Sequence, residues 1–237
     1  MKNLKNWDKK TWLSSNKYTS SIINFLEKRV KFNKETKILD IGCGRGKIIS
    51  TLSEKYQMIN LPLGIDIIDH KNAVRKIKFA KANAVKYLSK TKKKFDLILF
   101  KQSIHFFTFD EIKKILNLSK KNLNSNGKII ILALHPNQNY WPVFEVFKTK
   151  LIHSLKKDKK ILDIIKYNFK NYKINYFVFK VKISKVSYLQ MIKNRFTSCL
   201  LNLSSKELKN GVEEVKKKYK KKLMFNDKLI CISYIKK

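Results

Sequence analysis

Short apolar runs alternate with amphipathic stretches between Lys37 and Leu134. The apolar runs have the length of strands, and the stretches between them place apolar residues at helical spacing. Such alternation predicts βαβ units around a parallel sheet that helices cover on both faces, an α/β fold. Ligands of these sheets bind at the carboxyl ends of the strands. The expected strands are 37–41, 61–67, 77–80, 95–100 and 128–134, and the expected helices are 47–56, 72–76, 84–89 and 110–122, the last with Asp110 as its N-cap.

The flanking regions continue the pattern without a Pro-, Gly- or Ser-rich linker. We therefore expect a single domain over residues 1–237. It comprises a helical segment at 1–36, a core at 37–135 and a C-terminal part at 136–237. The expected flanking helices are 20–30, 140–155, 159–167, 186–200 and 205–222, and the expected strands are 172–184 and 228–235.

The strongest local signal is the sequence Lys37-Ile-Leu-Asp-Ile-Gly-Cys-Gly-Arg-Gly-Lys47. Glycines at alternate positions let a backbone turn sharply and approach a ligand closely. The helix that follows presents unpaired N–H groups and the positive end of its dipole, which suit a carboxylate or phosphate. The spacing is neither that of a dinucleotide fingerprint nor that of a P-loop. With Asp40 two residues before the first glycine, it indicates a ligand that bears both a carboxylate and an ammonium.

At this point the sequence resembles the class I S-adenosylmethionine-dependent methyltransferases, in particular the branch that acts on small molecules and ubiquinone. Five ordered segments carry the resemblance: ILDIGCGRG, LGIDII, Ala82-Asn83-Ala84, FDLILFKQSIHFF (95–107), and the loop and strand 123–131. The resemblance implies S-adenosylmethionine as cofactor. It also implies a Rossmann-like, seven-stranded sheet of order 3-2-1-4-5-7-6, with a helical cap at about 186–222 before the last strand.

The resemblance also implies which residues hold the cofactor. Asp66 occupies the position of the acid that holds the ribose hydroxyls, and a carboxylate suits a diol because its two oxygens accept both protons. Ile67 is placed to pack on the adenine, and Asn83 stands where the family usually has an acid that contacts the adenine amino group. The implied cofactor-binding residues are Asp40, Gly42, Cys43, Gly44, Gly46, Asp66, Ile67, Asn83, Ala84, Lys101 and Tyr18.

The predicted reaction is direct displacement of the cofactor's methyl group by a nitrogen, oxygen or sulfur nucleophile. The sulfonium makes that methyl electrophilic, so the protein positions and desolvates the nucleophile. A base is needed only for a protonated nucleophile. His105, just after the fourth strand, is the best-placed candidate, because its charge changes near neutral pH. The alternative is that His105 only packs in the loop.

Three further residues are candidate substrate contacts, in addition to His105. His135 follows the fifth strand and faces the ligand edge. Trp141 opens the region after the sheet, where it would line a substrate pocket or belong to the core. Arg195 is the only arginine of the cap and would pair with a substrate carboxylate, or else lie exposed. No cluster of cysteines and histidines indicates a metal site.

The formal net charge of +37 favours a nucleic acid or an anionic surface as partner. Two observations oppose that interpretation. Arg29, Arg45, Arg75 and Arg195 are the only arginines among 54 basic residues, whereas recognition of phosphates and bases favours arginine. The excess charge is also nearly equal in residues 1–135 and 136–237. We therefore interpret most of it as a consequence of Lys-rich composition.

Two other functions stay open. An RNA methyltransferase would agree with the charge, although the fourth motif reads Lys101-Gln-Ser-Ile104 and lacks the Asn/Asp-Pro-Pro-aromatic tetrad of enzymes that methylate base amines. A domain that binds the cofactor without catalysis is the other alternative. The apolar runs are too short to span a bilayer, and the polar first residues lack the centre of a secretory signal, which predicts a cytoplasmic protein.

Overall fold

The computed structural model describes residues 11–70, 75–137 and 140–237. Its seven strands form one sheet of order β3-β2-β1-β4-β5-β7-β6, as the resemblance implied. The strands are β1 (Ile38–Ile41), β2 (Leu63–Asp66), β3 (Lys78–Lys81), β4 (Phe95–Lys101), β5 (Leu123–Leu134), β6 (Tyr172–Ser184) and β7 (Lys222–Ile235). The helices are α1 (Asn16–Glu27), α2 (Lys47–Lys55), α3 (Ala84–Lys90), α4 (Phe109–Lys121), α5 (Glu145–Asn168), α6 (Lys185–Lys193), α7 (Ser198–Leu201) and α8 (Ser205–Lys218).

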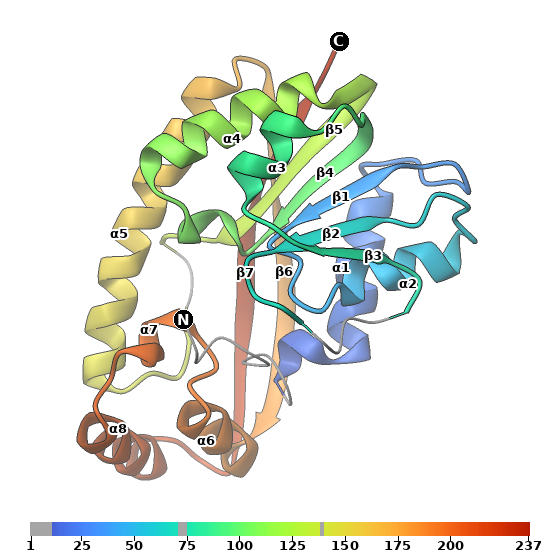
Figure 1. Cartoon of the computed structure of the whole chain (residues 1–237). Helices are drawn as coiled ribbons and strands as arrows, with labels where there is room; N and C mark the ends of the chain where they lie inside the picture. The colour runs from blue at the N-terminus through green and yellow to red at the C-terminus, as the bar shows by residue number, and fades with distance from the viewer. Residues whose placement is uncertain (1–10, 71–74, 138–139) are drawn as a thin grey trace. The chain divides into compact units, whose positions relative to one another are not determined.

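The register of the sheet aligns the ends of its central strands. β1 lies between β2 and β4, and all of these pairs are parallel, as are β2 with β3 and β4 with β5. β7 runs antiparallel to β5, from Lys128 opposite Ile235 to Leu134 opposite Leu229. Parallel strands bring their carboxyl ends to one edge. The glycine loop after β1, Asp66 in β2 and Lys101 in β4 therefore share that edge (Figure 1).

The chain divides into two compact units that are each built from separate segments. The first, here the aromatic unit, comprises residues 1–21, 135–157 and 178–228. The second, here the sheet unit, comprises residues 22–134, 158–177 and 229–237. The long elements α5, β6 and β7 contribute residues to both.

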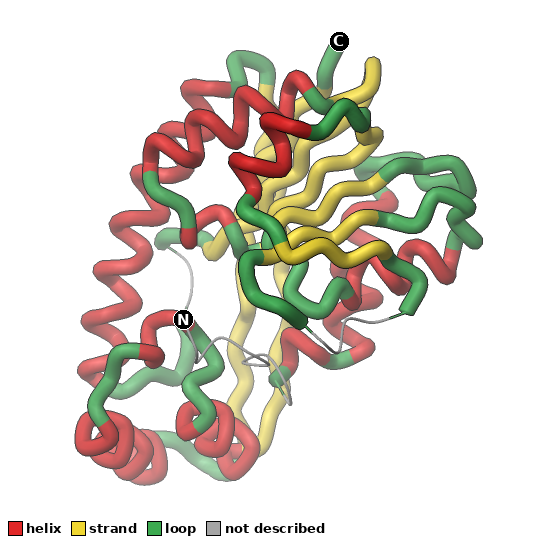
Figure 2. Tube along the Cα trace, viewed as in Figure 1, coloured by secondary structure: helices red, strands yellow, loops and turns green. Residues whose placement is uncertain are grey.

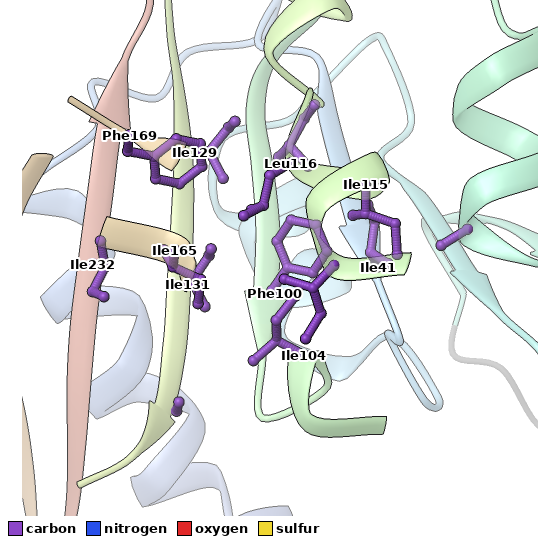
Figure 3. Close-up of a cluster of buried hydrophobic side chains, with 14 of the residues drawn as sticks. Ile41, Phe100, Ile104, Ile115, Leu116, Ile129, Ile131, Ile165, Phe169 and Ile232 are labelled. Carbon is purple, nitrogen blue, oxygen red and sulfur yellow. The ribbon is translucent and has the colours of Figure 1, made fainter. Parts of the chain in front are cut away.

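The core of the sheet unit lies where α4 and the last turns of α5 cover β4 and β5. Figure 3 shows Ile115 and Leu116 of α4 near Phe100, and Ile165 and Phe169 beside Ile129 and Ile131. These side chains are almost completely buried. Burying each contributes about 1.5–3 kcal/mol. α1 and α2 lie across the other face of the sheet (Figure 1).

The aromatic unit is built around a cluster of rings. Trp12 meets Trp141, Phe196 and Phe225 edge-on, with ring centroids 5.2–5.6 Å apart. The Trp12 indole also donates a hydrogen bond of 3.0 Å to Asp227, whose side chain is fully buried. Such edge contacts each contribute about 0.5–1.5 kcal/mol beyond area burial, so these rings define the unit's core.

Several predicted boundaries need correction (Figure 2). The predicted N-cap of the helix 110–122, Asp110, is wrong. The helix begins one residue earlier, and Thr108 caps it by accepting from the Glu111 N–H in a capping box. The helices predicted at 140–155 and 159–167 form one 24-residue helix, α5. The charged run between them contains no breaker, and lysine is a good helix former.

The predicted helix 186–200 is interrupted. α6 ends before Arg195, which has φ +53°, and α7 follows from Ser198. A residue in the left-handed region just after a helix is a common terminator. The helix predicted at 72–76 is not confirmed: residues 71–74 lie outside the described part, and 75–76 form a bend. Within the described residues, no helix is long and apolar enough to cross a membrane.

Candidate functional site

The glycine loop between β1 and α2 has the backbone that its sequence predicts. Gly42, Gly44 and Gly46 all have positive φ, at 71°, 55° and 76°. The loop is tied to the next strand, because the Gly42 N–H donates to the Ile65 carbonyl at 2.8 Å. A side chain in this left-handed region would be strained at any of the three positions.

Two of these glycines also face neighbours at close range, and the third does not. A Cβ on Gly42 would lie 2.4 Å from the Ser103 Cβ, and one on Gly46 would lie 2.3 Å from Ile77. A Cβ on Gly44, by contrast, would meet nothing within 4 Å. Gly44 therefore borders open space at the carboxyl edge of the sheet, where a ligand can approach the backbone.

Asp66 at the end of β2 is held by this loop. One of its oxygens accepts the Gly44 N–H at 3.0 Å, and the other accepts the Ile68 N–H at 3.0 Å. Its side chain is 13% exposed, so the carboxylate is oriented but still reachable. A carboxylate oxygen has two lone pairs, which leaves capacity for the hydroxyls of a diol.

Asp40 is the most perturbed acid of the site. Its side chain is 3% exposed, and its Oδ1 has no hydrogen-bond partner among the described residues. Burial raises the pKa of Asp40 to about 7; Lys101 opposes this rise, and the nearby Asp66 adds to it. A buried, unpartnered carboxyl oxygen costs free energy unless a ligand supplies a donor.

The implied cofactor fits these observations. The open space beside Gly44 accommodates a ligand against the loop backbone, and the orphaned oxygen of Asp40 suits the ammonium of its amino-acid part. Asp66 presents a fixed carboxylate for the ribose diol. These two acceptors suit the ammonium and the ribose diol of S-adenosylmethionine.

Cys43 contributes packing to the loop. A Cβ on Gly64 would lie 2.6 Å from the Cys43 sulfur, so the thiol fills the space over β2. Burial raises the pKa of the Cys43 thiol far above its ordinary value, and the charges of Asp40 and Asp66 raise it further. The thiol is therefore protonated and unreactive.

The remaining predicted cofactor contacts of the sheet unit stay predictions. Ile67 is 43% exposed, available for packing on a flat ring. Asn83 is the N-cap of α3, and its Oδ1 accepts the Lys86 N–H at 3.1 Å. Ala84, the first residue of α3, is buried. Lys101 ends β4 half-buried, close enough to lower the pKa of Asp40.

Two histidines lie near this edge, one predicted and one missed. His105 is half-buried in a short 3-10 helix (Ile104–Phe106) just after β4, with its ring 4.1 Å from that of Phe106. His70 was not among the predicted site residues. It is 7% exposed, and its Nε2 lies 3.8 Å from the Asp66 carboxylate. The i to i+4 spacing from Asp66 was the one signal available.

Four other predicted site residues belong to the aromatic unit, and the structure gives each a local role. Tyr18 is 1% exposed, and burial raises its pKa well above the ordinary value, with a further contribution from Asp227. His135 is 8% exposed, and burial lowers its pKa, with a further contribution from Lys228. Their contacts with cofactor or substrate stay predictions.

Trp141 and Arg195 are likewise occupied. Trp141 is 7% exposed within the ring cluster. The Arg195 guanidinium donates from Nη1 to the carbonyls of Leu200 and Leu201, at the end of α7. Its role in substrate binding therefore stays a prediction beside an evident structural one.

Comparisons with known proteins identify the family and the fold. A family model described as a methyltransferase domain matches residues 32–222. A Dictyostelium discoideum protein named "Probable inactive O-methyltransferase 11" is 24% identical over 135 residues, which are 55% of this chain and 40% of that protein. The chain thus spans less than half the length of that relative.

Solved structures share the fold. A protein of an antibiotic biosynthesis pathway in Anabaena variabilis, described as a methyltransferase, has a TM-score of 0.68 at 14% identity; the match covers 90% of this chain and 96% of that one. The plantazolicin methyltransferase BpumL, solved with a monoazolic desmethylPZN analog and SAH, has a TM-score of 0.54 at 17% identity over 99% of this chain and 89% of its own.

Proposed function

Since the chain belongs to the methyltransferase domain family, we propose that it is an S-adenosylmethionine-dependent enzyme whose methyl acceptor is a small molecule. The observation that carries this proposal is the segment after β4. It reads Lys101-Gln-Ser-Ile104, and the Ser103 hydroxyl donates to the Ile41 carbonyl at 2.6 Å. Ser103 therefore holds the start of the glycine loop in place. The segment also lacks the Asn/Asp-Pro-Pro-aromatic tetrad of enzymes that methylate base amines.

The cofactor supplies an electrophilic methyl group on its sulfonium. Asp66 would hold the ribose through oxygens that Gly44 and Ile68 already orient. Asp40 would pair with the ammonium, which would favour the ionised carboxylate and give its buried oxygen a partner. Because the chain's own task is to position the acceptor, proximity can lower the barrier by up to about 7–11 kcal/mol.

We propose His105 as the base for acceptors that arrive protonated. It follows β4 at the cofactor edge and lies in the same compact unit as Asp40 and Asp66. His135, Trp141 and Arg195 remain our proposed substrate contacts, with Tyr18 as a further cofactor contact. These substrate contacts would explain a preference for an acceptor that bears a carboxylate.

The test of the proposed function uses S-adenosylmethionine labelled on its methyl group. The full chain is incubated with a metabolite extract and, separately, with total RNA. We expect label in a small product that mass spectrometry identifies, and none with Asp66→Ala. Label confined to RNA would contradict the small-molecule proposal, and label in neither fraction would favour a domain that binds the cofactor without catalysis.

His105 is tested once an acceptor is known. His105→Ala should lower turnover by about 10²–10⁴-fold and remove the acid limb of the pH profile. His153→Ala, at an exposed position of α5, is the matched control. Turnover that stays intact across pH in His105→Ala would exclude it as the base.

A further inference from the structure

We propose that the face at the amino ends of the strands, opposite the cofactor site, binds single-stranded RNA. This proposal is independent of the identity of the methyl acceptor. We call the surface that carries it the lysine strip. It consists of Lys90, Lys92, Lys93, Lys94, Lys120, Lys121, Lys166, Lys170 and Lys173.

Hydrogen bonds join the three segments of the strip into one surface. Lys94 Nζ, just before β4, donates to the Lys121 carbonyl at the end of α4, at 2.7 Å. Lys120 Nζ donates at 3.3 Å to the carbonyl of Asn168, which ends α5. Figure 1 shows the ends of α4 and α5 together at the top of the view. All these residues belong to the sheet unit.

The strip contains more lysines than the ends of α3, α4 and α5 account for. Residues 86–95, 112–122 and 164–177 contain no Asp or Glu. Lysines in the last turn of a helix are stabilised by its dipole, which accounts for those that end α3, α4 and α5. Lys92, Lys93, Lys170 and Lys173, however, lie outside those helices and are exposed. Such concentrated positive charge attracts a polyanion.

Exposed tyrosines alternate with the lysines at one end of the strip. Tyr167 is 90% exposed, Tyr176 53% and Tyr172 37%. Single-stranded nucleic acids bind where a cationic path follows the backbone and aromatic rings stack on the bases. Within the three segments, the exposed large apolar side chains are all tyrosines. A membrane-binding face would instead present Leu, Ile or Phe for insertion.

A polar cavity of about 650 Å³ lies at the same edge. Its lining includes Lys31, Lys37, Asn33, Asn60, Asn124, Asn126, Glu35 and Asp96. The acid Asp96 is already satisfied, because it accepts the Lys37 N–H at 2.8 Å and the Asn124 amide at 2.6 Å. The two lysines of this lining balance its two acids, and its amides offer further donors for phosphate oxygens at the same edge.

The position of the strip determines what bound RNA can do. The strip lies at the amino ends of the strands, whereas Asp40 and Asp66 lie at or near the carboxyl ends. RNA on the strip is therefore held away from the methyl group. We expect it to dock the enzyme without being methylated and without changing the affinity for S-adenosylmethionine.

The first test measures binding of a fluorescent single-stranded RNA to the full chain as a function of salt. Lys92→Gln, Lys93→Gln and Lys170→Gln are combined in one variant. The control combines Lys217→Gln, Lys220→Gln and Lys221→Gln, exposed lysines of the aromatic unit, and has the same net charge. The strip variant should lower the slope of log affinity against log salt by about 2, at roughly 0.7 per phosphate contact.

An equal fall in both variants would mean that only net charge matters, and would overturn the proposal. So would the absence of RNA binding by the unaltered chain at low salt. Calorimetry with S-adenosylmethionine should give the same affinity for both variants, which shows that the sheet unit is folded.

The second test separates RNA from an anionic membrane. Tyr167→Ala should weaken RNA binding about tenfold through lost base stacking, and the loss should persist at high salt. Tyr140→Ala, at an 85% exposed tyrosine of the aromatic unit, should have no effect. Vesicles rich in phosphatidylserine that bind more tightly than RNA, with the Lys92/Lys93/Lys170 variant losing that binding, would assign the strip to a membrane and overturn the proposal.

Discussion

Asp40 couples cofactor binding to pH. Its pKa of about 7 in the folded protein lies above the ordinary 3.8 because of burial. Below pH 7 the carboxyl is protonated in the free protein and must lose its proton to hold an ammonium. The affinity for S-adenosylmethionine should therefore rise about tenfold between pH 6 and pH 8, as calorimetry at each pH would measure.

The control for this pH dependence is Asp40→Asn, which keeps the shape and cannot ionise. Its affinity should be lower at pH 8 and nearly flat with pH. The same raised pKa makes the folded state bind more protons than the unfolded state, so Asp40 lowers stability as pH rises from about 4 to 7. A native profile as flat as that of Asp40→Asn would contradict the role of Asp40.

The second prediction at the scale of residues concerns the hydrogen-bonded pair Asp66 and Gly44. Asp66→Ala removes the acceptor of the Gly44 N–H and the proposed ribose contact, and Gly44→Val forces a branched side chain to φ +55° and into the open space beside the loop. Each should weaken S-adenosylmethionine binding at least tenfold in calorimetry. Asp69→Asn, at an exposed acid three residues on, serves as control; unchanged affinity in both site variants would refute the site.

The residues that sequence could locate are those whose backbone dictates their type. Gly42, Gly44 and Gly46 need positive φ, and Asp66 ends a strand at a spacing that the fold explains. The proximity of His70 to Asp66 could not be foreseen, because it depends on the path of the loop after β2. Nor could the contact of Arg195 with the end of α7, since it needs a break in a helix that looked continuous.

Thr108 gives a prediction at the scale of elements. Its side chain caps α4 and forms a capping box with Glu111. Thr108→Ala should lower the free energy of unfolding by about 1 kcal/mol in urea titration. Asp110→Ala should change it by a few tenths at most, because that residue makes only an exposed 3.5 Å pair with Lys113. The opposite order would restore Asp110 as the cap.

At Gly211 in α8 we expect alanine to destabilise the protein, contrary to the usual effect of replacing a glycine within a helix. Replacing a helical glycine by alanine stabilises a helix by about 1 kcal/mol on propensity alone. Here a Cβ would lie 2.4 Å from the Phe144 ring, within one compact unit. Gly211→Ala should therefore destabilise the protein by about 1–3 kcal/mol. Gly211→Ala with Phe144→Leu should recover part of that loss; a stabilised single variant would show that the Phe144 ring moves aside easily.

Element types followed from sequence, whereas several boundaries did not. Apolar periodicity reflects which face is buried, so it located β1, β4, β6 and α2 closely. It says little about where helices join, because a charged run such as 156–160 suits both a loop and a solvated helix. α5 continues through that run since nothing in it disfavours a helix.

At the scale of the whole molecule, the fold class could be predicted, because alternating strands and helices have few packed solutions. The distribution of charge could not. Along the sequence, the excess positive charge is nearly equal in residues 1–135 and 136–237. The fold brings together segments as distant as 90–94, 120–121 and 166–173, so the lysine strip arises only in three dimensions.

The division into two units gives the last prediction. Each unit is assembled from three separate segments, and α5, β6 and β7 run through both. Neither unit can keep its part of these elements if the other unfolds, so we expect one cooperative transition. Trp12 and Trp141, the tryptophans among the described residues, provide a specific probe, since both lie in the aromatic unit, whereas the proposed cofactor residues Asp40 and Asp66 lie in the sheet unit.

Tryptophan fluorescence and far-ultraviolet circular dichroism should therefore give the same urea midpoint. S-adenosylmethionine at a hundred times its Kd should stabilise both signals equally, by about 2.7 kcal/mol, although it binds residues of the sheet unit. Asp66→Ala should abolish this shift for both probes. If the ligand raised the circular dichroism midpoint but not the fluorescence midpoint, the two units would unfold independently. Ligand binding would then stabilise the sheet unit alone.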